Sequence, residues 1–169
     1  LRSAMEFYND FYYIPVASEL LVCNLKDKYA GTLDCLGFVI LDAGVCSNPN
    51  KPLIEGIDPT RHDFSWQLSS KDWTKRECIH CGKKVKYKLA LIDYKTSNSI
   101  KKKPTYCAQV SAYAKAFNIM TGIKVHDHII VRLDKKQAKY EAIRIKDPVE
   151  CYRNFKLMQA LSPWLDPSL

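Results

Sequence analysis

An apolar run that ends in two charged residues, two positions apart, most constrains how this chain can fold. Residues 89–92 are apolar, and Asp93 and Lys95 follow directly. A short apolar run bounded by turn-forming residues is typical of a buried strand. Side chains two positions apart on a strand leave by the same face, so this carboxylate and this ammonium would share one face. Together they can serve a metal ion and a charged substrate, although a plain surface ion pair would have the same spacing.

Two further polar patterns lie on either side of this stretch. Upstream, residues 29–41 predict a second strand, in which Asp34 stands three positions after Gly31. Downstream, Gln109 and Tyr113 are four positions apart, which puts them on one face of a helix. The chain therefore carries Gly-x-x-Asp, then apolar-Asp-x-Lys-Thr, then Gln-x-x-x-Tyr.

These three motifs, in this order, resemble those of the PD-(D/E)xK nuclease superfamily. The chain looks most like its RecB-like exonuclease branch, which includes the mitochondrial genome-maintenance exonuclease and the CRISPR-associated nucleases of that type. The resemblance covers roughly residues 19–120. It implies an α/β fold with a restriction-endonuclease-like core, in which helices flank a central mixed β-sheet and an irregular insertion interrupts it.

The acidic residues of these motifs predict a metal site. Asp34 and Asp93, brought together on adjacent strands, would offer the oxygen ligands that Mg²⁺ and Mn²⁺ favour. By the resemblance, the backbone carbonyl of Tyr94 would be a third ligand. Glu19 stands where the family often has an acidic residue before the first strand, and that residue helps to hold metal in some members. A solvated glutamate is the alternative for Glu19.

The resemblance also implies how the other polar residues act. Lys95 would orient the attacking water or stabilise the charged transition state. Gln109 and Tyr113 would position water, Lys95 or a phosphate. The predicted catalytic set is Asp34, Asp93, Lys95, Gln109 and Tyr113.

The irregular stretch before the central motif predicts an insertion over residues 44–86. A structureless segment of this length is unusual in a compact domain, so we expect a cross-link, such as a bound metal ion, to hold it together. Cys78 and Cys81 belong to a Cys-x-x-Cys-Gly turn, of the kind that binds zinc through two thiolates.

A structural zinc needs four ligands, and this turn supplies two. Cys46, His62 and His80 are the candidates for the others, and His62 is favoured because His80 lies inside the turn. The predicted zinc set is Cys46, His62, Cys78 and Cys81. An iron–sulfur cluster would need four cysteines, and an ordinary reduced turn is the remaining alternative.

The charge of the chain predicts a polyanionic partner. Lysine and arginine together number 26, against 18 aspartate and glutamate, which gives a formal net charge of +8. Nucleic acid is the commonest such partner, and we expect DNA. Two lysine groups flank the central motif and would contact phosphates, although charge runs are more usually solvated faces. The predicted DNA-binding residues are Lys83, Lys84, Lys86, Lys101, Lys102 and Lys103.

Length and composition predict one soluble domain over residues 1–169, with one substantial core. No apolar run approaches the ~20 residues of a membrane span, and the first residues do not form a signal peptide.

The seven cysteines are therefore expected to be reduced thiols in a cytoplasmic, intracellular protein of a bacterial, archaeal or virus-infected cell. A chain that opens without methionine is expected to be a trimmed fragment. The sequence leaves the oligomeric state open.

Proline residues predict where the two ends of the chain change structure. Residues 3–18 predict a short helix or an irregular arm, with Pro15 as a breaker. Pro148 predicts the start of a last helix that continues to about residue 161. Its predicted buried stripe is Val149, Tyr152, Phe155 and Met158.

Taken together, these patterns predict a metal-dependent deoxyribonuclease that acts as an exonuclease on single strands or DNA ends. One alternative is a nucleic-acid-binding module that keeps the nuclease fold with a spent site. Another is a zinc-stabilised nucleic-acid-binding protein in which Asp-x-Lys is incidental.

Overall fold

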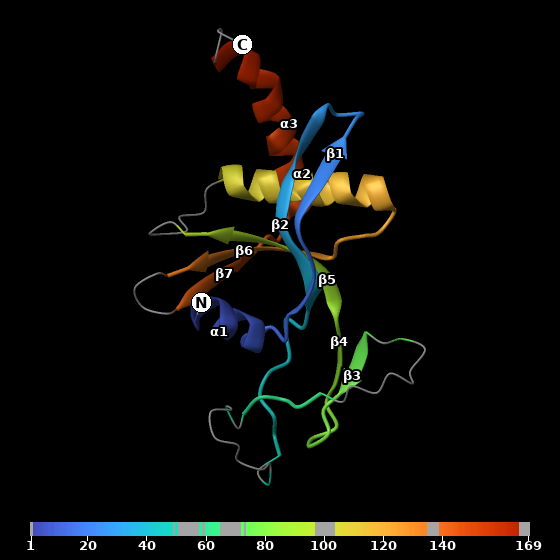
Figure 1. Cartoon of the computed structure of the whole chain (residues 1–169), viewed down its shortest axis with the longest axis vertical. Helices are drawn as coiled ribbons and strands as arrows, with labels where there is room; N and C mark the ends of the chain where they lie inside the picture. Colours follow the sequence, from blue (N-terminus) through green and yellow to red (C-terminus); the bar gives the residue numbers. More distant parts are fainter. Residues whose placement is uncertain are drawn as a thin grey trace.

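The computed structural model is a mixed α/β fold in which helices flank a five-stranded sheet (Figure 1). It describes residues 2–48, 50, 58, 60–64, 72, 74–96, 104–134 and 139–165. The elements are α1 (Arg2–Asp10), β1 (Ile14–Asn24), β2 (Tyr29–Val39), β3 (Lys75–Glu77), β4 (Lys84–Lys86), β5 (Lys88–Lys95), α2 (Pro104–Thr121), β6 (Asp127–Leu133), β7 (Tyr140–Arg144) and α3 (Pro148–Leu165). The predicted central mixed sheet flanked by helices is confirmed.

The sheet has the strand order β1-β2-β5-β6-β7. Strands β1, β2 and β5 are antiparallel neighbours, β5 and β6 are parallel, and β6 and β7 are antiparallel. A parallel pair needs a crossover connection, and α2 supplies it between β5 and β6. The register of β2 against β5 pairs Cys35 with Ile92, so the next positions, Asp34 and Asp93, stand side by side.

Each face of the sheet has its own apolar core. On one face, α2 packs Val110, Ala114 and Phe117 against Leu91 and Ile130. On the other face, α1 contributes Phe7 to a core that includes Ile92, Ile129 and Val131. Because β5 and β6 are covered on both sides, their middle residues are continuously apolar, as parallel strands usually are.

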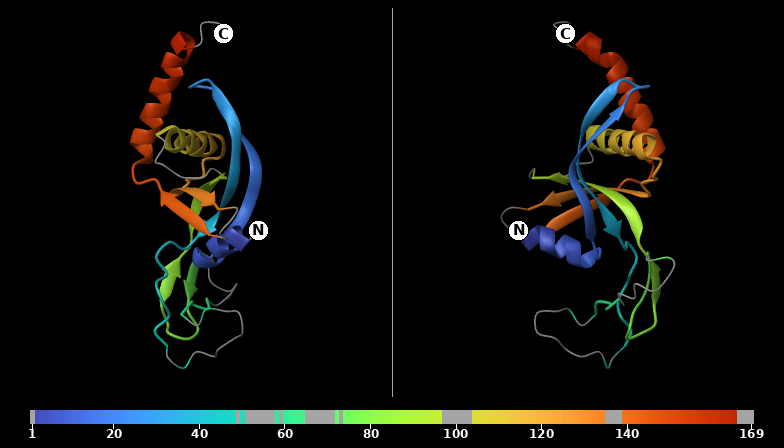
Figure 2. Two further views of the ribbon diagram at one scale, coloured as in Figure 1. Left: turned by 90° about the vertical axis from the view of Figure 1, so that its left-hand side faces the viewer. Right: turned by 45° about the vertical axis from the view of Figure 1, so that its right-hand side comes forward.

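A second, two-stranded sheet lies beyond the start of β5 and extends away from the main sheet (Figures 1 and 2). In it, β3 and β4 pair antiparallel, with Arg76 opposite Val85. Tyr87 separates β4 from β5, and its N–H donates to the Thr74 carbonyl at 2.8 Å. Strands β4 and β5 are therefore separate, and each belongs to a different sheet.

The last helix, α3, stands beside the turn of the long β1–β2 hairpin (Figure 2). Its Tyr152 and Phe155 are half-buried, as predicted, but Val149 and Met158 are 63% and 36% exposed, so the predicted stripe is wrong at these two positions. The helix turns a polar edge to the hairpin instead of Met158. Lys156 pairs with Asp27 at 3.1 Å, and Gln159 donates to the Asp27 carbonyl at 2.9 Å.

The prediction that Pro15 interrupts the chain is also wrong. Pro15 lies within β1 and faces Gly37 of β2, and the register shifts between Pro15 and Ala17. A proline is tolerated here because β1 is an edge strand, where a missing N–H leaves no partner unsatisfied. Within the described part of the chain, none of the helices has the length and apolarity that a membrane crossing requires.

Candidate active site and metal-binding cluster

Strand β5 ends in a buried ion pair beneath α2. The side chain of Asp93 is 5% exposed, and the Nζ atom of Lys95 lies 3.0 Å from its Oδ1 and 2.8 Å from its Oδ2. Leu91, two positions earlier, belongs to the core under α2, so the predicted sharing of one face holds for these residues. The ammonium also lies 4.9 Å from the centroid of the Tyr106 ring on α2. No local spacing in the sequence singles out Tyr106, because its place in the site depends on how α2 crosses the sheet.

Asp34 reaches the same site from the neighbouring strand β2. Its Oδ2 accepts a hydrogen bond of 2.8 Å from the backbone N–H of Tyr94. Asp34 is only half-buried, whereas Asp93 is buried, so the two carboxylates differ in their access to water. The structure thus brings the two predicted carboxylate ligands together, with the backbone N–H of Tyr94 bonded to one of them, and the carbonyl of Tyr94 stays a predicted ligand.

The surroundings of Asp93 raise the pKa of its carboxyl group above the usual value. Burial raises the pKa of this carboxyl group, the nearby Asp34 raises it further, and the bond to Lys95 partly opposes both effects. Oδ2 is near the ammonium but accepts no directed hydrogen bond from any described residue. A buried carboxylate oxygen with an open acceptor position, facing a second carboxylate, fits a hard divalent cation.

The first half of α2 adds a polar pair beside these strands. The Nε2 atom of Gln109 donates to the Tyr113 hydroxyl at 3.1 Å, as their four-residue spacing allows. The Tyr113 ring lies directly against Gly31 of β2, where an added Cβ would come within 2.5 Å of a ring carbon. The glycine of the Gly-x-x-Asp motif therefore makes room for the tyrosine of the Gln-x-x-x-Tyr motif.

Glu19 is placed differently from the other predicted ligands. It lies between Ser18 and Leu20, which pair with Cys35 and Leu33, so the register sets it across from Asp34. Its φ of 52° is unusual for a residue with a side chain, and that side chain is exposed. Among the described residues its carboxylate does not join the two aspartates in a compact group of ligand atoms.

The predicted DNA-binding lysines divide into two sets. Lys83, Lys84 and Lys86 are exposed on the insertion, at the opposite end of β5 from Lys95. Acidic residues already face two of them: Lys84 lies 3.8 Å from Glu77, and Lys86 lies 3.7 Å from Asp72. The predicted contacts at residues 101–103 lie outside the described residues.

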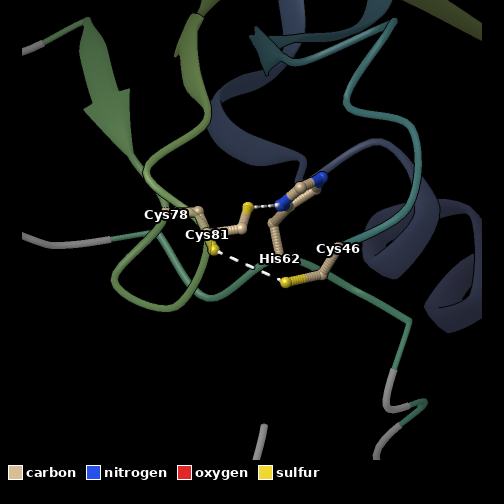
Figure 3. A group of neighbouring side chains, drawn as sticks. All are labelled: Cys46, His62, Cys78 and Cys81. Atoms are coloured by element: carbon tan, nitrogen blue, oxygen red, sulfur yellow. Dashed lines mark hydrogen bonds between the residues drawn. The ribbon is translucent and has the colours of Figure 1, made fainter. Parts of the chain in front are cut away.

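The insertion brings the four predicted zinc ligands together. Their ligand atoms all lie within 4.8 Å of one another, and no other such group of three or more occurs among the described residues. Figure 3 shows the side chains converging from three separate segments. We call this group, Cys46, His62, Cys78 and Cys81, the Cys/His cluster. Its chemistry suits a metal ion such as zinc.

The Cys/His cluster is enclosed and polarised by its surroundings. Cys78 and His62 are 2% and 3% exposed. Burial raises the pKa of the Cys78 thiol, but hydrogen bonds from the backbone of Cys81 and His80 outweigh this and lower it to about 6. The remaining candidate ligand, His80, is engaged elsewhere, because its Nε2 lies 2.8 Å from Oδ2 of Asp63.

The chain therefore has two candidate metal sites. One is the pair of carboxylates with a lysine under α2, and the other is the Cys/His cluster in the insertion. Comparison of the sequence with protein-family models and with curated proteins gave no match in either case.

Proposed function

We propose that this chain is a metal-dependent nuclease of the PD-(D/E)xK type, with a restriction-endonuclease-like core. The observation that carries the proposal is the meeting of Asp34, Asp93 and Lys95 at one end of the β2–β5 pair. Asp34 is far in sequence from Asp93 and Lys95, and the meeting of the three residues supports the motif resemblance. A mixed sheet with helices on both faces is also what that resemblance implies.

The carboxylates are suited to holding the cation that phosphodiester hydrolysis needs. When bound, Mg²⁺ or Mn²⁺ would lower the pKa of a water ligand and neutralise charge on the phosphate. Asp34 and Asp93 would hold the ion, and the backbone carbonyl of Tyr94 would be a third oxygen ligand. The cation would also favour the charged form of Asp93, whose pKa burial raises.

The remaining residues of the site would act on water and phosphate. Lys95 can donate to the attacking water or to the charged transition state, and Tyr106 and Asp93 limit where its ammonium can go. Gln109 and Tyr113, bonded to each other, would orient the water, Lys95 or a non-bridging phosphate oxygen.

The substrate in this proposal is DNA, cleaved from ends or as single strands. The formal net charge of +8 supports a polyanionic partner. The seven cysteines are all free, which supports an intracellular setting where thiols stay reduced.

Titration of Mg²⁺ and Mn²⁺ with fluorescently labelled DNA tests the proposal. Single-stranded and blunt duplex substrates, each labelled at one end, would report cleavage, its polarity and its dependence on ends. We expect cleavage that requires the added cation, stops with EDTA and is lost in Asp93→Asn. DNA binding without cleavage at any cation concentration would instead indicate a spent nuclease fold. Cleavage that Asp93→Asn leaves intact would contradict the assigned site.

A further inference from the structure

We propose that the Cys/His cluster binds one structural Zn²⁺ in a closed tetrahedral site that fastens the insertion to the corner between α1 and β1. This inference does not depend on nuclease activity, because its observations lie in the insertion and its measurements do not use DNA.

The spacing of the ligand atoms matches a tetrahedral zinc site. Bonds of about 2.3 Å to sulfur and about 2.0 Å to nitrogen put neighbouring sulfurs about 3.8 Å apart, and a sulfur and a nitrogen about 3.5 Å apart. The sulfurs of Cys46 and Cys78 lie 3.9 Å apart, and the Cys81 sulfur lies 3.4 Å from Nδ1 of His62. The first distance also excludes a disulfide, in which the sulfurs are about 2.05 Å apart.

The choice of the fourth ligand follows from the two histidines. Nδ1 of His62 points at the sulfurs, as Figure 3 shows, whereas His80 turns its Nε2 to Asp63. With three sulfurs and one nitrogen from the protein, no position is left for water or substrate, which is the pattern of a structural site. The soft sulfur ligands favour zinc over the Mg²⁺ or Mn²⁺ proposed for the carboxylates.

The backbone of the insertion is arranged to present these ligands. Cys78 donates its N–H to the Lys83 carbonyl and accepts from the Gly82 N–H, each at 2.9 Å, which closes the turn around the two thiols. Gly82 has a φ of 71°, a conformation that costs a glycine little. The segment with His62 is tied to the turn by the Ile79 N–H, which donates to the Asp63 carbonyl at 3.0 Å.

The same segment connects the metal site to the main fold. The backbone N–H of His62 donates to the Tyr12 hydroxyl at 2.7 Å, and the guanidinium of Arg61 lies 4.8 Å from the Tyr12 ring centroid. The Phe64 ring packs edge-on against Tyr12, with 4.9 Å between centroids. By contrast, the described residues of this region include one small buried apolar cluster: Ile40, Ala43 and Tyr87. A metal would supply the order that so small a core cannot, because ordering a loop costs conformational entropy.

Elemental analysis of protein purified without added metal tests this inference directly. We expect about one zinc per chain in the wild type, and at least about 100-fold weaker zinc binding in Cys78→Ser and in His62→Asn. Cys23→Ser makes the same chemical change in β1, outside the cluster, and should keep the zinc. His80→Asn should keep it too; loss of zinc in His80→Asn with retention in His62→Asn would overturn the ligand assignment.

Two measurements on wild-type protein keep the test valid if the variants fail to fold. Replacement of zinc by Co²⁺ should give the strong visible absorption of tetrahedral cobalt together with thiolate-to-cobalt charge transfer. Removal of the metal with a chelator should raise hydrogen exchange around residues 43–48, 60–64 and 74–86, and leave β5 and α2 protected. Zinc-free protein with unchanged exchange in the insertion, iron in place of zinc, or a disulfide between two of the cysteines would each overturn the proposal.

Discussion

The two candidate metal sites are built on opposite kinds of structure. The carboxylate site stands on neighbouring strands, where the β2–β5 ladder and the cores on both faces fix Asp34 and Asp93. The Cys/His cluster gathers its side chains from three segments of an insertion whose described residues form only a small apolar core. The sheet can therefore hold its ligands in position without an ion, whereas the insertion would gain its order from one.

The two sites also differ in how the charge of their ligands is balanced. Lys95 compensates the charge of Asp93, so the carboxylate site has an internal counter-ion while no cation is bound. In the Cys/His cluster, the pKa of Cys78 is lowered to about 6, and the thiols that are still protonated would lose their protons when metal binds. We therefore expect separable metals: a hard, exchangeable cation at the carboxylates, and a tightly held zinc in the insertion.

The largest expected effect comes from Asp93→Asn, which removes a charge from the carboxylate site and keeps its shape. Cleavage should fall at least about 1,000-fold, equivalent to about 4 kcal/mol of transition-state stabilisation. Because burial raises the pKa of Asp93, its charged form costs stability at neutral pH, so the free energy of unfolding should be unchanged or higher. Its zinc content should stay the same as in the wild type. Activity assays, denaturant unfolding and elemental analysis check these three expectations.

Asp127→Asn is the matched control for that variant. Asp127 is another buried acid, paired with Arg144 at the start of β6, away from the end of the sheet that carries the carboxylate site. Its replacement should lower stability and leave the cleavage rate of folded protein nearly unchanged. If Asp93→Asn also lost its zinc, the two sites would be coupled, which would contradict the expectation that their metals are separable.

Lys95→Ala should have the next largest effect, about 100- to 1,000-fold on the cleavage rate. The reason is that its ammonium is the cation beside Asp93, in position to act on water and phosphate. Calorimetry should still detect Mn²⁺ binding, because the carboxylates remain. Lys88→Ala, at the exposed start of the same strand, is the control and should retain full activity. Loss of Mn²⁺ binding with the lysine would reassign Lys95 to assembly of the site.

Gly31→Ala should have a smaller effect, about tenfold on the cleavage rate. An added Cβ would meet the Tyr113 ring at 2.5 Å, so the ring must move and its bond from Gln109 must break. Tyr113→Leu should lower the cleavage rate by a similar factor. The double variant should be no slower than either single variant, because both changes remove the same Gln109–Tyr113 pair. Additive effects in this double-mutant cycle would show that Gly31 acts through something other than Tyr113.

The proximity of Asp34, Asp93 and Lys95 could be predicted from the sequence because its signals are local. A buried apolar run, a two-residue spacing and a four-residue spacing fix which side chains share a face, and the strands then bring Asp34 and Asp93 together. The Cys/His cluster was predicted from the number of ligands that zinc requires and from the length of the insertion. A turn with two thiols needs two more ligands, and a long irregular insertion needs a cross-link to hold it together. The structure brings those four ligands together.

What the sequence did not predict depends on contacts between distant segments. The position of Tyr106 beside Lys95 follows from the crossing of α2 over β5, which no local spacing encodes. Likewise, the polar edge of α3 faces Asp27 because the β1–β2 hairpin is long enough to reach that helix. Pro15 looked like a breaker because its edge position in the sheet is set by the order of all five strands.

The smallest expected effect concerns whether DNA extends from the carboxylate site to the insertion. The insertion presents Lys83, Lys84 and Lys86 to solvent. Removing a lysine that binds a phosphate of single-stranded DNA should reduce the slope of log affinity against log salt by about 0.7. Since Glu77 and Asp72 already face two of these lysines, Lys83→Ala alone should account for most of the change.

Binding of labelled single-stranded DNA to catalytically inactive Asp93→Asn, measured at several salt concentrations, tests this expectation. The variant with Lys83, Lys84 and Lys86 changed to alanine should show a slope only slightly flatter than Lys83→Ala, because an acid-paired lysine releases few counterions from DNA. Lys28→Ala, at the far turn of the β1–β2 hairpin, removes the same charge elsewhere and should leave the slope unchanged. An unchanged slope in the triple variant would separate the insertion from the DNA path, and the Cys/His cluster would then act on stability alone.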